Sequence, residues 1–81
     1  MWKVYILKSK KDFKYYIGST SNLEERLAKH NSGGNISTKN RRPLVLVYSE
    51  TYNTKTEALS RERKIKSYKG GQAFKSLVSN A

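Results

Sequence analysis

An acidic side chain in an unfavourable position is the strongest chemical signal in the sequence. Ala58, Leu59 and Ile65 set the inward stripe of a predicted helix. Glu62 falls within this stripe, between Ala58 and Ile65. A buried carboxylate without a partner is costly, so Glu62 requires an arginine or a metal ion beside it. A purely structural pair with Arg26 or with a lysine is the simpler interpretation.

Two tyrosines and an arginine–histidine pair are further candidates for chemistry. Tyr5 and Tyr16 occupy two strand-like segments and can stand on the same face of adjacent strands. Arg26 and His30 are one helical turn apart beside an apolar stripe, where they can face a sheet. Tyrosine in a small sheet is usually packing material, and a single histidine usually has a structural role. Residue type alone therefore favours core or edge positions for these side chains.

A β-hairpin is the first element that must position these residues. Its strands are Trp2 to Lys8 and Tyr15 to Thr20, both rich in aromatic and β-branched residues. The polar connector Ser9 to Lys14 joins them, as in a hairpin. Gly18 has no side chain, which leaves room for another group to approach the second strand.

A third strand is predicted for the continuous apolar run from Leu44 to Tyr48, which follows Pro43. Such a run suits a strand covered on both faces, so helices are expected on each side of the sheet. Ser49 to Asn53 is expected to be a turn or loop. The polar, basic segment from Asn35 to Arg42 has no periodicity and is predicted to be a loop.

Capping signals predict two helices. Ser21 to Glu24 has the pattern of a capping box, and its helix runs to about Asn31, where Gly33-Gly34 ends it. Thr54 to Glu57 is a second capping box, and its helix runs to about Ser67 or Tyr68.

Length and apolar content bound the architecture. The 81 residues allow one domain, residues 1–81, with a small core, and 36% of them are hydrophobic. The motif-bearing part is 2–66. The segment 70–81 is expected to form a short C-terminal helix or tail, packed on the sheet or frayed. Its apolar residues are Ala73, Phe74, Leu77 and Val78.

The net charge is the strongest compositional signal. Seventeen basic residues stand against six acidic ones, which gives a formal charge of +11. This favours a polyanionic partner such as nucleic acid over an anionic membrane surface, although a ribosomal or chromatin-type structural protein would carry the same charge. The lack of cysteine excludes disulfides, thiolate zinc sites and cysteine nucleophiles. No apolar run suits a signal peptide or a membrane span, so a cytoplasmic protein is expected.

Five motifs follow one another between Trp2 and about Lys66. K-V-Y ends at Tyr5 and Y-I-G begins at Tyr16, and they are followed by S-N-L-E-E-R-L-A-K-H-N, R-P-L-V-L-V-Y and T-E-A-L-S-R-E-R-K-I-K. In this order they resemble the small stand-alone bacterial branch of the GIY-YIG nuclease family. The chain is also similar to the nuclease module of bacterial nucleotide excision repair and to homing-endonuclease catalytic domains. Lys3 stands where the family name has glycine. The resemblance implies an α/β (α+β) fold, with a three-stranded antiparallel sheet and helices on both sides.

The resemblance also implies a catalytic set, namely Tyr5, Tyr16, Arg26, His30 and Glu62. Glu62 would hold one Mg²⁺ or Mn²⁺, weakly and only together with substrate, because one carboxylate leaves most of the coordination shell to water and phosphate. Arg26 would grip the phosphoryl oxygens. Tyr5 is expected to act as base or to orient water with help from His30, and Tyr16 to hydrogen-bond the water or a phosphate oxygen.

Basic residues of the loop and of the second helix are candidates for contacts with the phosphate backbone. They are Lys39, Arg41, Arg42, Lys64 and Lys66. Such contacts position nucleic acid without reading its sequence, and a solvated basic surface is an equally good interpretation of each. No stretch interleaves aromatic and basic residues in the manner typical of single-strand binding.

The function expected from these features is a divalent-metal-dependent endonuclease that hydrolyses DNA phosphodiester bonds in repair or processing. Its partner would be DNA, with branched and damaged forms among the candidates, and neither a membrane nor a small-molecule cofactor is expected. One alternative is a non-catalytic, basic nucleic-acid-binding module with the same fold. Another is a basic structural protein in which the tyrosines and Glu62 only stabilise the fold.

Overall fold

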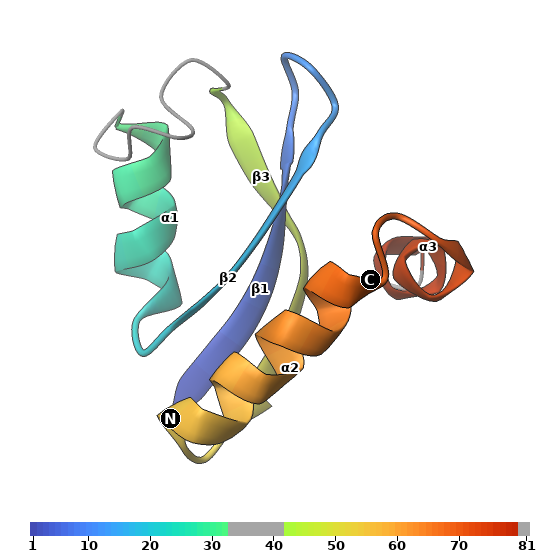
Figure 1. Cartoon of the computed structure of the whole chain (residues 1–81). Coiled ribbons are helices and arrows are strands. Elements are labelled where there is room, and N and C mark those ends of the chain that lie inside the picture. The colour runs from blue at the N-terminus through green and yellow to red at the C-terminus, as the bar shows by residue number, and fades with distance from the viewer. Residues whose placement is uncertain (33–41, 80–81) are drawn as a thin grey trace.

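The computed structural model describes residues 1–32 and 42–79 (Figure 1). In chain order the elements are β1 (Trp2–Ser9), β2 (Tyr15–Thr20), α1 (Leu23–Asn31), β3 (Leu44–Tyr52), α2 (Lys55–Ser67) and α3 (Gln72–Ser79). The strands form one antiparallel sheet in the order β2-β1-β3. Helix α1 lies on one side of this sheet, and α2 and α3 lie on the other (Figure 1). The predicted α+β fold is therefore confirmed.

Alternation along β1 divides the apolar side chains between two small cores. Val4 and Ile6 point to one face, where they pack with Ala58 and Ile65 of α2 and with Phe74 of α3. The opposite face carries the second core, whose members are Tyr5, Leu7 and Leu44 with Tyr16, Leu23 and Leu27 packed against them. Each core needs its own helical cover, which explains why helices lie on both sides of the sheet.

The central strand is β1, and this corrects the interpretation of the apolar run in β3. We expected that run to be covered on both faces, but β3 lies at an edge and Leu46 is 40% exposed. A register shift explains part of the difference, because Ile6 pairs with Tyr48 and Leu7 with Leu46, which leaves Val47 as an extra residue.

The third strand is also longer than predicted. We expected a turn or loop from Ser49 to Asn53, yet β3 continues to Tyr52. Its last residues pair with the beginning of β1, with Tyr52 opposite Trp2 and Ser49 opposite Tyr5. Threonine and tyrosine are good strand formers, and a full-length partner in β1 extends the ladder through them.

The two helix starts differ from each other in how well their caps were predicted. Thr54 caps helix α2 as expected, and its hydroxyl accepts a hydrogen bond from the Glu57 backbone N–H at 3.2 Å. The cap of α1 is Asn22 and not Ser21, because Asn22 Oδ1 accepts from the Glu25 backbone N–H at 3.1 Å. Asparagine is at least as good a cap as serine, so the helix starts one residue later than the capping-box pattern predicts. The expected stop at Gly33-Gly34 lies outside the described residues.

A charged network fixes α2 against β3. The Glu50 carboxylate accepts hydrogen bonds from Arg61 Nε at 2.8 Å and Nη2 at 3.0 Å, from the Tyr52 hydroxyl at 2.6 Å, and from the Tyr48 hydroxyl. Arg61 Nη1 also donates to the Tyr68 hydroxyl at 3.3 Å. Burial opposes the ionisation of Glu50, but the bonds from Arg61, Tyr48 and Tyr52 outweigh it and lower its pKa to about 2. The network therefore sets the position of the helix that carries Glu62.

Candidate active site

The ring of Tyr5 crosses over the edge strand β2 at Gly18. These two residues face each other in the register of β1 and β2. A Cβ atom at Gly18 would lie 2.5 Å from Tyr5 Oη and 2.7 Å from Cζ. Only glycine therefore allows the Tyr5 ring to occupy this position. The group for which Gly18 makes room is thus the phenol of Tyr5 itself. Its hydroxyl is carried from the central strand toward the edge of the sheet.

Tyr5 meets His30, which lies in the last turn of α1. Tyr5 Oη is 3.3 Å from His30 Nε2, and both side chains are buried. Burial lowers the pKa of His30, and the positive charges of Arg26 and Lys29 lower it further. His30 is therefore neutral at neutral pH, and in the tautomer whose Nε2 carries no hydrogen the Tyr5 hydroxyl donates to it.

The pKa of the Tyr5 phenol is shifted in the opposite direction. Burial raises it above 10.0, the charge of Arg26 acts against this rise, and the charge of Glu62 adds to it. Tyr5 is thus a neutral phenol at neutral pH and cannot serve as a base without passing its own proton onward. The same result shows that Arg26 and Glu62 both lie within electrostatic range of the Tyr5 hydroxyl.

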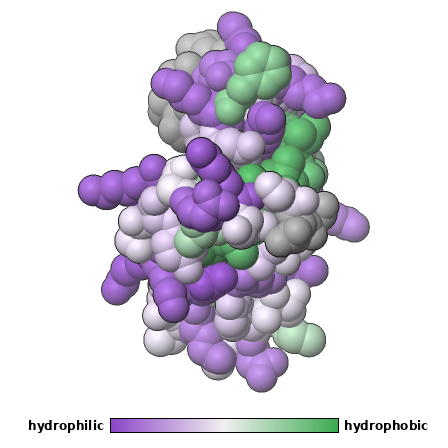
Figure 2. Space-filling model, turned by 90° about the vertical axis from the view of Figure 1, so that its right-hand side faces the viewer, coloured by the Kyte–Doolittle hydropathy of each residue, from purple (hydrophilic) through white to green (hydrophobic). Residues whose placement is uncertain are grey.

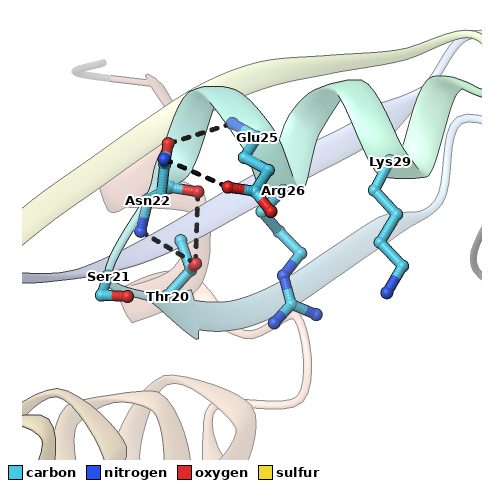
Figure 3. Close-up of a pocket in the computed structure, with 6 residues that line it drawn as sticks. All are labelled: Thr20, Ser21, Asn22, Glu25, Arg26 and Lys29. Atoms are coloured by element: carbon cyan, nitrogen blue, oxygen red, sulfur yellow. Dashed lines mark hydrogen bonds between the residues drawn. The ribbon is translucent and has the colours of Figure 1, made fainter.

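Arg26 lies at a polar cavity of about 200 Å³ between the end of β2 and the first turns of α1 (Figure 3). Arg26 and Lys29 extend from α1 in the same direction, and Thr20, Ser21 and Asn22 form the opposite wall (Figure 3). A guanidinium group and an ammonium group on neighbouring turns suit the oxygens of a phosphate. Arg26 and His30 lie one turn apart on α1, and the charge of Arg26 lowers the pKa of His30.

Glu62 reaches the same strand from the other face of the sheet. Glu62 Oε1 accepts a hydrogen bond from the Ser19 hydroxyl at 2.7 Å, and Oε2 pairs with Lys66 Nζ at 2.7 Å. The side chain is 16% exposed, so the carboxylate is at the rim and not in the core. The pair with a lysine that we considered as a structural alternative is therefore present. Because Lys66 is 54% exposed, solvent screens this pair and it contributes little to stability.

Ser19 was missed by the sequence reasoning, although a signal existed. Side chains alternate along β2, so Tyr15, Ile17 and Ser19 all face α2. Ile17 packs in the core under α2, and Ser19 bonds Glu62 on that helix. A serine that follows a core isoleucine by two positions is on the face where Glu62 was expected.

Tyr16 lies on the α1 face of the sheet together with Tyr5, as predicted. It stands opposite Leu7 and packs against the core formed by Tyr5, Leu7 and Leu44. Its side chain is partly exposed. The common face of the two tyrosines is thus confirmed, while the role of Tyr16 in catalysis stays a prediction.

The donor atoms near Glu62 suit a hard divalent cation. They are a carboxylate and the hydroxyl of Ser19, both oxygen donors, at a partly exposed position. Among residues 1–32 and 42–79, no three His, Cys, Asp or Glu side chains are grouped to hold a metal ion. The protein would therefore supply one carboxylate, and water and phosphate oxygens would supply most of the shell, which Mg²⁺ tolerates well.

The residues predicted to contact phosphate lie at different places in the structure. Lys66 lies at Glu62. Lys64 lines a separate cavity together with Tyr52 and Arg61. Arg42 is exposed just before β3. Lys39 and Arg41 lie outside the described residues, as does most of the basic loop.

Comparison with known proteins relates the chain to one domain family. The profile of the GIY-YIG catalytic domain matches residues 1–73. UPF0213 protein SH2523 of Staphylococcus haemolyticus is 48% identical over 75 residues, which cover 91% of this chain and 90% of that protein. A UPF0213 protein of Staphylococcus aureus is 50% identical over 66 residues, covering 80% and 79%.

A solved structure is also similar, the solution NMR structure of the UPF0213 protein BH0048 from Bacillus halodurans. It shares 36% identity with a TM-score of 0.60, over 98% of this chain and 84% of that one. No helix within the described residues is both long and apolar enough to cross a membrane. The match to the catalytic-domain profile extends over most of the chain and includes every residue of the site described above, and the chain therefore belongs to the GIY-YIG family of nuclease domains.

Proposed function

We propose that this protein is a divalent-metal-dependent endonuclease that hydrolyses DNA phosphodiester bonds, in repair or processing of cytoplasmic DNA. One observation carries the proposal. The Tyr5 hydroxyl is bonded to the neutral base His30 and lies within electrostatic range of both a guanidinium and a carboxylate. Those are the groups required to activate water, to bind a phosphate and to hold a cation beside it.

Proton removal is assigned to Tyr5 and His30 acting together. A water molecule beside the Tyr5 hydroxyl would attack phosphorus and give its proton to the phenol oxygen, while the phenol proton passes to His30 Nε2. The bond from phosphorus to the leaving sugar oxygen breaks, and that oxygen takes up a proton from solvent water. The 3.3 Å contact provides this path. The depressed pKa keeps His30 unprotonated and ready to accept at neutral pH. Tyr16, on the same face, would hydrogen-bond the water or a phosphate oxygen.

Charge stabilisation is assigned to Arg26 and Glu62. Arg26 would bind the phosphoryl oxygens with its planar fork from the cavity beside β2. Glu62, oriented by Ser19, would hold Mg²⁺ or Mn²⁺, and Lys66 would then release the carboxylate oxygen that it now pairs with. When bound, the cation supplies Lewis-acid polarisation of the phosphate.

The test is cleavage of supercoiled plasmid with Mg²⁺, Mn²⁺ or EDTA, by the wild-type protein and by Glu62→Gln. Glu57→Gln is the matched control, because Glu57 lies on the same helix but is exposed at its cap. We expect metal-dependent nicking by the wild type and by the control, and its loss in Glu62→Gln. Salt-sensitive DNA binding without any cleavage would overturn the proposal and support a non-catalytic binding module.

The form of the substrate is tested next. Defined branched, damaged and linear duplexes of equal length, labelled on one strand, would be compared at one enzyme concentration. Preferential cutting at a branch or lesion supports a role in repair or processing. Equal cutting of all forms would contradict that part of the proposal.

A further inference from the structure

A second cavity lies beside the catalytic region, on the face of the sheet that α2 covers. Its volume is about 470 Å³, and it is walled by the hairpin turn, the end of α2 and α3. We call it the aromatic groove and define it by Phe13, Lys14, Tyr15, Lys66, Lys69 and Phe74. Figure 2 faces this side, and it shows hydrophobic atoms among hydrophilic ones at the upper end of the molecule, where Figure 1 places the hairpin turn.

Phe13 occupies an unusual position at the mouth of the aromatic groove. Its φ is 61°, a left-handed conformation that favours glycine and strains a bulky residue. The side chain is nevertheless 66% exposed, so burial within the protein does not offset the strain. A turn of this kind needs only glycine or asparagine. An aromatic ring kept here in solvent therefore suits contact with a ligand.

The chemistry of the groove suits a nucleic acid strand. Lys8 Nζ lies 5.7 Å from the ring centre of Phe13 and 5.6 Å from that of Tyr15, so one ammonium group is within cation–π distance of both rings. Tyr15 is 37% exposed, and its ring is held edge-to-face by Phe74 at 5.0 Å. Lysines beside partly exposed rings are the combination that binds unpaired strands, because bases stack on the rings and lysines neutralise phosphates.

The aromatic groove is continuous with the catalytic region. Lys66 belongs to the groove and pairs with Glu62 one helical turn earlier. On β2, Ser19 contacts Glu62 and Tyr15 lines the groove on the same face. The separation of these two residues along the strand is about 13 Å, which about four stacked nucleotides span.

We infer that the aromatic groove binds unpaired nucleotides of the DNA strand that is cleaved, with a base stacked on Phe13. The choice of that strand rests on the proposed function, but the contact between ring and base does not. The sequence did not predict it, because no single stretch interleaves aromatic and basic residues in the pattern typical of single-strand binding. Folding brings them together from the hairpin turn, from Lys66 and Lys69 at the end of α2, and from α3.

The experiment measures DNA binding in a Glu62→Gln background, so that cleavage does not interfere. Fluorescence anisotropy would compare a labelled single-stranded oligothymidylate with a hairpin duplex at one salt concentration. The variant is Phe13→Gly, which suits the left-handed backbone and should fold at least as well. The matched control is Leu46→Ser, another exposed apolar side chain, on the strand at the opposite edge.

Phe13→Gly should weaken binding of the single strand roughly tenfold, as expected for the loss of one stacked base. Duplex binding and the Leu46→Ser control should change by less than about twofold, and Phe13→Trp should restore the single-strand affinity. Equal losses for single strand and duplex, or no loss at all, would overturn the inference. A selective loss, with no cleavage by the wild-type protein on any substrate, would overturn the proposed nuclease activity and leave the groove assigned.

Discussion

Tyr5 fills the space that a side chain at Gly18 would need. A Cβ atom at residue 18 would be 2.5 Å from Tyr5 Oη and 3.2 Å from Cε2. The two residues are register partners on β1 and β2, so the contact follows from the pairing of the strands. This relationship fixes where the phenol oxygen lies relative to His30.

Gly18→Ala should therefore displace the Tyr5 ring and break its hydrogen bond to His30. We expect plasmid cleavage to fall by at least about tenfold, with a loss of about 1–3 kcal/mol of folding free energy from overpacking. Cleavage rates and urea unfolding measure the two effects. In a Tyr5→Ala background the methyl group has space, so Gly18→Ala should there cost almost no stability. Wild-type cleavage by the single variant would contradict the assigned position of Tyr5.

The pH dependence of cleavage should reflect the depressed pKa of His30. Burial and the charges of Arg26 and Lys29 lower this pKa below 6.5, and the neutral ring is the form that accepts a proton. Activity should thus persist when the pH is lowered to 6.5 and should decline only below pH 6.5. Lys29→Gln removes one of the charges and should move the acid limb of kcat/KM to higher pH, whereas Lys75→Gln on α3 should not. An acid limb above 6.5 in the wild type would contradict the proposed base.

The requirement for metal should decrease when Lys66 is removed. Lys66 Nζ lies 2.7 Å from Glu62 Oε2 and would compete with a cation for that oxygen. We expect Lys66→Ala to reach half-maximal activity at a metal concentration a few-fold lower, measured at saturating DNA because Lys66 also lines the aromatic groove. Lys64→Ala, on the same helix but at a separate cavity lined by Arg61, is the control. Equal metal requirements in both variants would argue against Glu62 as the cation ligand.

Local sequence patterns predicted the elements well and their mutual arrangement less well. The hairpin, both long helices and the shared face of Tyr5 and Tyr16 follow from periodicity and capping, which depend on near neighbours. The edge position of β3 does not, because apolar runs mark burial without showing which strand is central.

The candidate site was likewise predicted in part by local sequence patterns. The helical stripe indicated that Glu62 faces the sheet, and the structure agrees. Its exposure and its two partners, Ser19 and Lys66, depend on how α2 crosses β2, which no local pattern encodes. Arg61 and Glu50 were missed entirely, because their pairing joins a helix to a strand segment that was expected to be a loop.

Acid should destabilise the protein through Glu50. Its pKa in the folded protein is about 2 against 4.5 for an unperturbed glutamate, so the unfolded chain binds the proton more readily. The stabilisation is fully present above pH 4.5 and is lost as the pH falls from 4.5 toward 2, by about 3 kcal/mol in total. Urea unfolding across this pH range, in the wild type and in Glu50→Gln, measures this loss of stability.

Glu50→Gln should be less stable at neutral pH, because it leaves Arg61 without its carboxylate, and its stability should depend less steeply on pH in acid. Glu57→Gln should keep the wild-type slope. An unchanged slope in Glu50→Gln would show that some other carboxylate controls acid unfolding and that this network does not fix α2 on the sheet.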